Sequence, residues 1–354
     1  MAGAARVALP VLWYRRRLAL ALVPLLPLSW LFLLLVLLRR ALFRRGVLRS
    51  YALPVPVIVV GNLTVGGSGK TPLVLWLLDR LREAGWRPGV ISRGYGGRGG
   101  TASGVQAVTA TSPGAGVGDE PLLLARRGGA PVYVGRDRVA AGQALLAAHP
   151  ECNVIISDDG LQHYRLQRTV ELAVFDGRGA GNACLLPAGP LREPLRRLAE
   201  VTAVVWNGCP ETLAARAAHA LPQFDMQLVG HRFFALHDGQ HFCTAEALRG
   251  KRLYAMAGIG DPARFFAQLT ALGLEFEAHP FADHHAYCAA DLAFAQDGVL
   301  LMTEKDAVKC AAIYAEIPLA EAWVLPVEAE INVAADHAGL LETILEKLNG
   351  RTLA

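Results

Sequence analysis

A glycine-rich loop followed by a lysine and a threonine is the first pattern in this chain that could do chemistry. It covers residues 61–71, G-N-L-T-V-G-G-S-G-K-T, between an apolar run at 55–60 and an apolar stretch ending at Leu81. This order predicts a strand, a loop and a helix. Such a loop points backbone N–H groups at phosphate oxygens, a lysine at the β and γ phosphates, and a hydroxyl at Mg²⁺. The predicted nucleotide-binding residues are Gly66, Gly67, Ser68, Gly69, Lys70 and Thr71.

The loop departs from the strict P-loop pattern at one position, where Thr64 replaces the first glycine. Its G-G-x-G-K-T ending resembles the variant loops of the ATPases that include partition and targeting proteins. A second metal-binding acid is expected at the end of another buried strand. Residues 154–157 form such a run and lead into Asp158 and Asp159. Either aspartate, together with Thr71, is predicted to hold Mg²⁺ directly or through water.

The elements around these motifs indicate an α/β fold with a parallel sheet. Strand-like stretches at 89–91, 132–134, 170–175 and 201–206 alternate with helical segments. Ligands collect at the carboxyl ends of such strands, and polar motifs at 92–97, 135–138 and 158–163 follow strand ends. The predicted domains are a membrane anchor at 1–50, a P-loop core at 51–223 and a smaller C-terminal α/β lobe at 224–354. In the lobe, strands are expected at 225–236, 253–257, 274–278 and 323–327, and a cleft between the two lobes is the natural catalytic site.

The N-terminal segment reads as a membrane element. From Leu18 to Leu38 the chain is uncharged and leucine-rich, about as long as the roughly 20 residues that span a bilayer. Residues 1–50 contain nine arginines and no acidic residue, whereas the remainder is net acidic. A basic flank suits an anionic membrane surface and argues against a nucleic-acid binder. Arginines at both ends and two prolines leave open whether the helix spans the bilayer or lies in it; a buried core helix is the other alternative.

Taken together, several strings resemble the tetraacyldisaccharide 4′-kinases of lipid A synthesis in Gram-negative bacteria. Besides residues 61–72, the matching strings are S-R-G-Y-G-G at 92–97, G-D-E-P at 118–121, D-D-G-L-Q-H at 158–163, L-P-A-G-P-L-R-E-P at 186–194, F-A-D-H at 281–284 and T-E-K-D-A-V-K at 303–309. They run from the anchor nearly to the end of the chain, and Thr64 belongs to the family's own loop pattern.

The resemblance implies ATP and Mg²⁺ as co-reactants and transfer of the γ-phosphate to the 4′-hydroxyl of a tetraacyldisaccharide 1-phosphate. It also implies a membrane-embedded or amphipathic N-terminal helix, and we expect an inner-membrane enzyme. Its six cysteines form no C-x-x-C pair, which fits an active domain facing the reducing cytoplasm, and no obligate protein partner is evident. The residues implied around the disaccharide and phosphates are Arg93, Tyr95, His163, Arg192 and Glu193. Arg192 and Glu193 lie between two prolines, in a loop that could also be merely charged and exposed.

Four further constellations carry alternatives. Asp119 and His284 are predicted to act together on the acceptor hydroxyl, with Lys70 as the third catalytic residue; which of the two takes the proton is left open. Zinc is not expected at residues 283–285, because no third ligand follows at a suitable spacing. Thr303 begins either a helix cap or a ligand-proximal loop, with the cap slightly favoured. Arg136 and Arg138 either clamp phosphates or form surface ion pairs.

Two functions fit the sequence. The first is the lipid-sugar kinase, and the second is a membrane-associated ATPase switch that positions protein partners. The hydrophobic anchor fits both. The Arg192 loop and the Asp119–His284 pair favour the kinase, because a switch has no acceptor hydroxyl to recognise.

Overall fold

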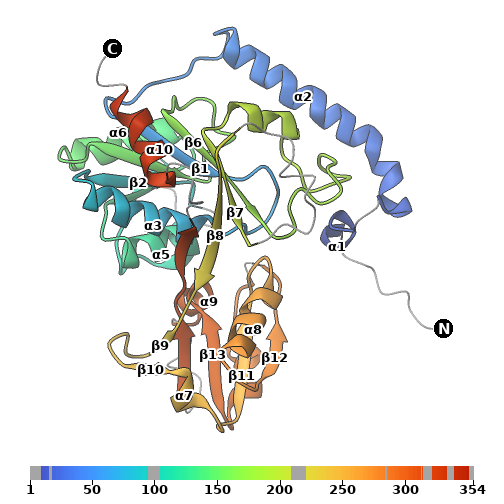
Figure 1. Cartoon of the computed structure of the whole chain (residues 1–354), viewed down its shortest axis with the longest axis vertical. Helices are drawn as coiled ribbons and strands as arrows, with labels where there is room; N and C mark the ends of the chain where they lie inside the picture. The colour runs from blue at the N-terminus through green and yellow to red at the C-terminus, as the bar shows by residue number, and fades with distance from the viewer. Residues whose placement is uncertain are drawn as a thin grey trace.

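The computed structural model describes residues 9–15, 18–94, 104–208, 221–283, 285–311, 313, 321–332 and 339–350. Within this part of the chain the architecture is α/β, with two sheets that form separate lobes (Figure 1). An apolar helix lies along the outside of the larger lobe. The predicted fold class is confirmed.

The N-terminal segment consists of α1 (Leu9–Trp13), a 3-10 turn η1 (Leu20–Leu25) and α2 (Leu26–Arg44). Residues 20–44 are long and apolar enough to cross a membrane, and only 11% of their most apolar window is buried, unlike a core helix. The helix continues beyond Leu38, where the predicted apolar segment ends. The reason is tertiary: Arg40 is buried and pairs with Glu200 at 2.5 Å, so it belongs to the protein-facing side.

The larger sheet has, among the described residues, nine strands in the order β15-β8-β7-β6-β1-β5-β2-β4-β3. Two edge strands are antiparallel to their neighbours, β3 (Val105–Val108) and β15 (Glu328–Asn332). The others are parallel: β1 (Val57–Gly61), β2 (Pro88–Ser92), β4 (Val132–Gly135), β5 (Val154–Asp158), β6 (Val170–Asp176), β7 (Ala203–Asn207) and β8 (Gln223–Val229). Their carboxyl ends therefore meet at one edge.

Helices cover both faces of this sheet, as a buried parallel sheet requires. On one face α3 (Lys70–Glu83), α5 (Asp119–Arg127) and α10 (Leu340–Asn349) bury Leu77, Leu122 and Ile344 in one core. On the other face α6 (Arg138–Ala148) and the 3-10 helix η2 (Leu195–Glu200) bury Leu145 and Leu198. A short helix, α4 (Gly114–Val117), directly precedes α5. We call this unit the first lobe.

The smaller sheet, the second lobe, has the order β10-β9-β14-β13-β11-β12 among the described residues. Its parallel strands are β11 (Leu253–Ala257), β12 (Glu277–Pro280), β13 (Val299–Thr303) and β14 (Glu321–Leu325), followed by antiparallel β9 (Arg232–Ala235) and β10 (Phe242–Thr244). One face packs against α7 (Ala245–Leu248) and α8 (Pro262–Ala271), the other against α9 (Glu304–Cys310) and the 3-10 helix η4 (Ala289–Ala295).

The structure corrects the predicted boundary at residue 224. Strands β8 and β15 and helix α10 pack in the first lobe, so the second lobe comprises roughly residues 230–327 as an insertion. The predicted strand at 225–236 breaks at Gly230, where a Cβ atom would lie 2.5 Å from the Pro326 carbonyl oxygen. Two connections thus cross between the lobes side by side. The strand predicted at 274–278 begins later, at Glu277.

Candidate active site between the two lobes

The glycine-rich loop runs from the end of β1 to the start of α3. Gly66 and Gly69 have φ angles of 106° and 87°, in the left-handed region that favours glycine. A Cβ atom on Gly69 would also collide with the Asn207 side chain. Because α3 begins at Lys70, its free N–H groups face the loop, and this is the geometry that binds phosphate.

Lys70 lies in one polar cluster with the loop that follows residue 185. Its Nζ is 3.5 Å from Asp159 Oδ1 and 3.4 Å from Asn62 Oδ1. Arg192 donates to both Asp159 oxygens, at 3.1 and 3.4 Å, and to the Asn62 carbonyl at 3.0 Å. Asn62 is fully buried and also donates to the Gly66 carbonyl at 3.0 Å. Asn62 was not among the predicted site residues. The available signal was a polar amide that directly follows a strand of β-branched residues.

Asp158 and Asp159 are neighbours in sequence but differ in ionisation. Asp158 ends β5 with no exposed surface, and burial and the Glu120 carboxylate raise its pKa to about 7. Ser92 donates to Asp158 Oδ2 at 3.1 Å, whereas Oδ1 has no hydrogen-bond partner among the described residues. Burial also acts to raise the pKa of Asp159, but the charges of Lys70 and Arg192 outweigh it and hold that pKa well below its usual range. Asp159 is therefore a carboxylate at neutral pH.

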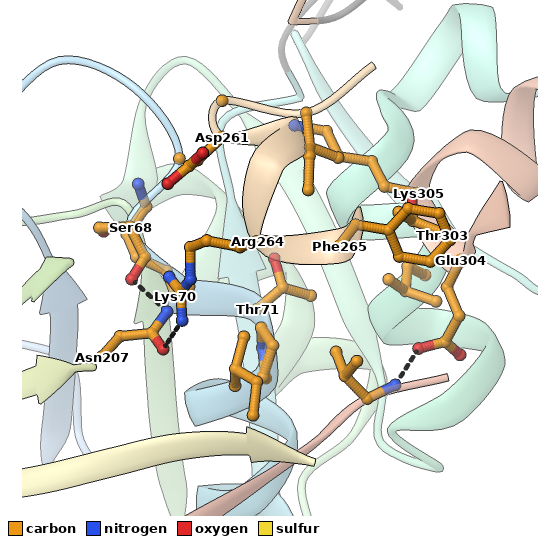
Figure 2. Close-up of a pocket in the computed structure, with 18 of the residues that line it drawn as sticks. Ser68, Lys70, Thr71, Asn207, Asp261, Arg264, Phe265, Thr303, Glu304 and Lys305 are labelled. Carbon is orange, nitrogen blue, oxygen red and sulfur yellow. Dashed lines mark hydrogen bonds between the residues drawn. The ribbon is translucent and has the colours of Figure 1, made fainter. Parts of the chain in front are cut away.

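A pocket of about 230 Å³ lies where the glycine loop meets the second lobe, as predicted for a cleft between lobes. Ser68, Lys70 and Thr71 line one end (Figure 2). The pocket also has an apolar wall, beside charged residues such as Glu120 and Lys305, and this wall is formed by Leu75, Leu123, Leu228, Phe265, Leu325 and Val327. The pocket thus combines phosphate-directed groups with a surface suited to a flat apolar ring.

An asparagine and an arginine join the two lobes beside this pocket. Asn207, at the end of β7, donates to the Ser68 carbonyl at 3.0 Å. Arg264 of α8 donates to Asn207 Oδ1 at 2.5 Å, as Figure 2 shows. Backbone contact adds to this link, since a Cβ atom on Gly260 would lie 2.8 Å from the Gly67 nitrogen. Neither side chain was predicted, because their proximity depends on how the lobes pack.

Comparison with known proteins places this site in a family. The family model described as tetraacyldisaccharide-1-P 4′-kinase matches residues 21–349. The tetraacyldisaccharide 4′-kinase of Dechloromonas aromatica is 56% identical, with 97% of each chain covered. That of Azoarcus sp. is 55% identical, with 98% of each chain covered. The chain belongs to this kinase family. A solved structure, the "apo" form of LpxK from Aquifex aeolicus in complex with ATP, has a TM-score of 0.74 and 28% identity and covers 95% of this chain and 100% of that chain.

The residues expected around a disaccharide in this family take different positions. Arg192 faces the Lys70 cluster, and the exposed Arg93 directly follows β2. Glu193 is only 1% exposed; it accepts hydrogen bonds from the Tyr164 hydroxyl and, at 3.5 Å, from Gln162 Nε2. Burial raises its pKa. Glu193 therefore stabilises its loop from within. Tyr95 lies outside the described residues.

His163 and Arg138 lie beneath the same sheet edge. His163 Nε2 is 3.9 Å from Asp137 Oδ1, and burial and the Arg138 charge lower the pKa of His163 to about 4. Arg138 is 3% exposed and donates to the carbonyls of Gly135 at 2.9 Å and Asp158 at 3.4 Å. Arg138 therefore supports the backbone of the site and, among the described residues, forms no surface ion pair, whereas its role as a phosphate clamp stays a prediction.

The first residue of α5 is Asp119, and its partner in the predicted pair, His284, lies outside the described residues. Asp119 Oδ2 is 3.8 Å from Lys309 Nζ of the second lobe. The next residue, Glu120, lines the pocket. Thr303 caps α9 by accepting a hydrogen bond from the Asp306 nitrogen at 3.2 Å, so the predicted cap is confirmed. Thr303 also lines the pocket, so it is a helix cap and lies beside the pocket at the same time.

Proposed function

We propose that this chain transfers the γ-phosphate of ATP to the 4′-hydroxyl of a tetraacyldisaccharide 1-phosphate in lipid A synthesis. The observation that carries the proposal is the polar cluster in which Asp159 lies between Lys70 and Arg192. Lys70 belongs to the phosphate-binding loop, and Arg192 belongs to a loop with an arginine fork suited to a second phosphate. One cluster thus connects the nucleotide side with the acceptor side.

The triphosphate of ATP is proposed to lie on the backbone N–H groups of residues 66–70 and on Lys70. The base then points toward the apolar wall that contains Leu228 and Phe265. Binding energy from a base held against the second lobe would orient the γ-phosphate, and exclusion of water by both lobes would suppress hydrolysis of ATP.

The residues at the strand ends fit a magnesium ion. Asp158 Oδ1 is a buried oxygen without a hydrogen-bond partner in the described structure, and buried carboxylates require a compensating charge. Asp158 or Asp159, with the Thr71 hydroxyl, would hold the ion. When bound, Mg²⁺ neutralises charge that develops on the β and γ phosphates. The positive charge of the ion would also offset the repulsion between the Asp158 and Glu120 carboxylates.

For the acceptor, Arg93, Tyr95, His163 and Arg192 are proposed to contact the disaccharide and its phosphate, while Glu193 holds the loop. Asp119 and His284 are proposed to act on the 4′-hydroxyl, which is a poor nucleophile until a base takes its proton. The burial that lowers the pKa of His163 keeps it neutral at pH 7, so it offers a hydrogen bond rather than a charge.

Helix α2 is proposed to attach the enzyme to the cytoplasmic face of the inner membrane. Its outward side carries large apolar residues, including Leu28, Trp30, Leu31, Leu34, Leu35 and Leu38. Its inward side contacts the loop at residues 185–194, which carries Arg192 and which we call the acceptor loop. Ser29 Oγ donates to the Leu185 carbonyl at 2.9 Å and accepts from the Ala188 nitrogen at 3.0 Å. A lipid substrate and the acceptor loop would thereby meet at one surface.

The test is to follow γ-³²P-labelled ATP with a tetraacyldisaccharide 1-phosphate in mixed micelles. With the wild-type enzyme, the label is expected in the lipid fraction. With the Lys70→Ala variant, no labelled lipid is expected. Release of the label only as inorganic phosphate, at the same rate with and without lipid, would instead support the ATPase switch and refute the kinase assignment.

A further inference from the structure

Helix α9 of the second lobe faces α5 of the first lobe along a row of charged contacts. Arg127 Nη1 is 2.6 Å from Glu304 Oε2. Lys305 Nζ is 3.2 Å from Glu120 Oε1 and 3.3 Å from Asp283 Oδ1. Lys309 Nζ is 3.8 Å from Asp119 Oδ2. Lys305 and Lys309 are four residues apart, so they lie one turn apart on the same side of α9.

Lys309 is placed as a fixed charge rather than as a hydrogen-bond donor. Its side chain is 10% exposed, and Nζ has no hydrogen-bond partner among the described residues. Burying an ammonium group in this way is costly unless nearby charges compensate. The charges it faces are Asp119, across the lobe boundary, and Asp306, whose Oδ1 is 3.7 Å away. The Tyr287 ring, 5.4 Å from Nζ, covers it.

Asp306 is itself locked in place. It has no exposed surface and accepts hydrogen bonds from the Gly258 nitrogen at 3.2 Å, the Tyr287 hydroxyl at 2.9 Å and the Thr303 hydroxyl at 2.6 Å. A carboxylate so fully satisfied cannot follow Lys309 if that side chain moves. The ammonium is therefore held from behind by a rigid part of the second lobe and is directed at the first residue of α5.

We propose that Lys309, assisted by Lys305, is a positioning residue that holds the Asp119–Glu120 pair of the first lobe for phosphoryl transfer. Lys309 attracts the Asp119 carboxylate and fixes its orientation at the start of α5. Lys305 ties Glu120 to Asp283, the residue before His284. The inference depends on the proposed role of Asp119, and it assigns no contact with substrate to either lysine.

The test compares Lys309→Met with Lys309→Arg in steady-state assays of lipid phosphorylation. Lys309→Met is expected to lower kcat by about 10²-fold, the cost of misplacing a reacting group, while the KM for ATP changes less than about threefold. Lys309→Arg, which keeps the charge, should recover about a tenth or more of the wild-type kcat. Wild-type kcat in Lys309→Met, or no recovery with arginine, would overturn the proposal.

Two controls separate positioning from lobe docking. Lys251 is a half-exposed lysine that pairs with Glu321 inside the second lobe at 2.8 Å. Lys251→Met should change neither kcat nor the KM for ATP. Arg127→Gln breaks the other ion pair between α5 and α9, away from Asp119, and should lower the unfolding temperature but leave kcat within about threefold. If Arg127→Gln lowers kcat as much as Lys309→Met does, the lysines only hold the two lobes together, and their specific positioning role is refuted.

A double mutant distinguishes failure of this inference from failure of the proposed mechanism. In an Asp119→Asn background, Lys309→Met should cause no further loss, because the lysine acts through that carboxylate. Fully multiplicative losses would overturn the inference and leave the role of Asp119 intact. An Asp119→Asn enzyme with wild-type kcat would remove the proposed role of Asp119 and the inference together. If Lys309→Met does not fold, Lys305→Gln provides the corresponding cycle in a Glu120→Gln background, because Glu120 is the first-lobe carboxylate that Lys305 contacts at 3.2 Å.

Discussion

Lys70 and Lys305 each hold an ammonium group between two oxygen-bearing partners, but they draw those partners from different parts of the molecule. Lys70 contacts Asn62 and Asp159, which directly follow strands β1 and β5 of the same sheet. Lys305 contacts Glu120 from the first lobe and Asp283 from the second. The first cluster is held by the backbone of one sheet, whereas the second exists only while the two lobes keep this arrangement.

This difference suggests a division of work. Groups on the strand ends of the first lobe are preorganised, so they can bind phosphates without any movement. Groups that meet across the lobes can complete the site only when the lobes are together, which would tie proton transfer to exclusion of water. Substitutions in the first cluster should therefore affect nucleotide binding and chemistry, and substitutions of Asp119, Lys305 or Lys309 should affect chemistry with little change in ATP binding.

The largest effect is expected for Lys70→Ala, which breaks the first cluster. It removes the charge facing the β and γ phosphates and leaves Asp159 with Arg192 alone, so transfer should fall by about 10³-fold or more. Rates of lipid phosphorylation and the affinity for ATP, measured by calorimetry, should both decrease. Lys251→Ala serves as the control for a surface lysine. Activity near wild type in Lys70→Ala would refute the assignment of the phosphate-binding loop.

The second effect concerns Asp119 and His284, the residues proposed to act together on the acceptor hydroxyl. Asp119→Ala and His284→Ala should each lower kcat by about 10²- to 10⁴-fold, the usual contribution of a positioned base, with little change in the KM for ATP. If the two residues form one unit, the double variant should be scarcely slower than either single one. Multiplicative losses in the double variant would show that they act independently.

The third effect concerns the outward side of α2. Leu31, Leu34 and Leu35 are each more than half exposed. Replacing all three by serine should release much of the enzyme from vesicles and raise the KM for lipid acceptor about tenfold, with kcat retained in detergent micelles. Ser29→Ala, on the inward side, should instead cost about 1–3 kcal/mol of stability without affecting flotation. Unchanged flotation of the triple variant would refute the anchor.

The sequence predicted the parts of the site that are local. The strand, glycine loop and helix at 57–83 and the aspartates after β5 depend on contiguous residues, so pattern and turn chemistry were sufficient. Partners far apart in sequence were not foreseeable. The helix extends to Arg44 because Arg40 and Arg44 pair with Glu200, and β15 returns to the first sheet about a hundred residues after β8 leaves it. Lys309 appeared in a motif, but its direction toward Asp119 depends on lobe packing.

The smallest effect is a pH dependence of stability that only the folded structure reveals. Burial and the Arg138 charge lower the pKa of His163 from 6.5 to about 4, so between these two pH values the unfolded chain binds more protons at this residue than the native protein. Stability should therefore rise as pH increases from about 4 to 6.5 and should be lost as pH falls through this range. Because the side chain is 23% exposed, solvent screening limits the contribution to stability to on the order of 2 kcal/mol.

This contribution is measured by denaturant unfolding of the wild type and of His163→Gln at several pH values. The stability of the variant should depend less on pH than that of the wild type. As a control, replacing the exposed His231 by glutamine should leave the pH dependence of stability unchanged. Parallel profiles for wild type and His163→Gln would show that His163 is not held neutral. It would then carry a positive charge below about pH 6.5 on the acceptor side of the first cluster, and its proposed role as a neutral hydrogen-bonding group would be wrong in that pH range.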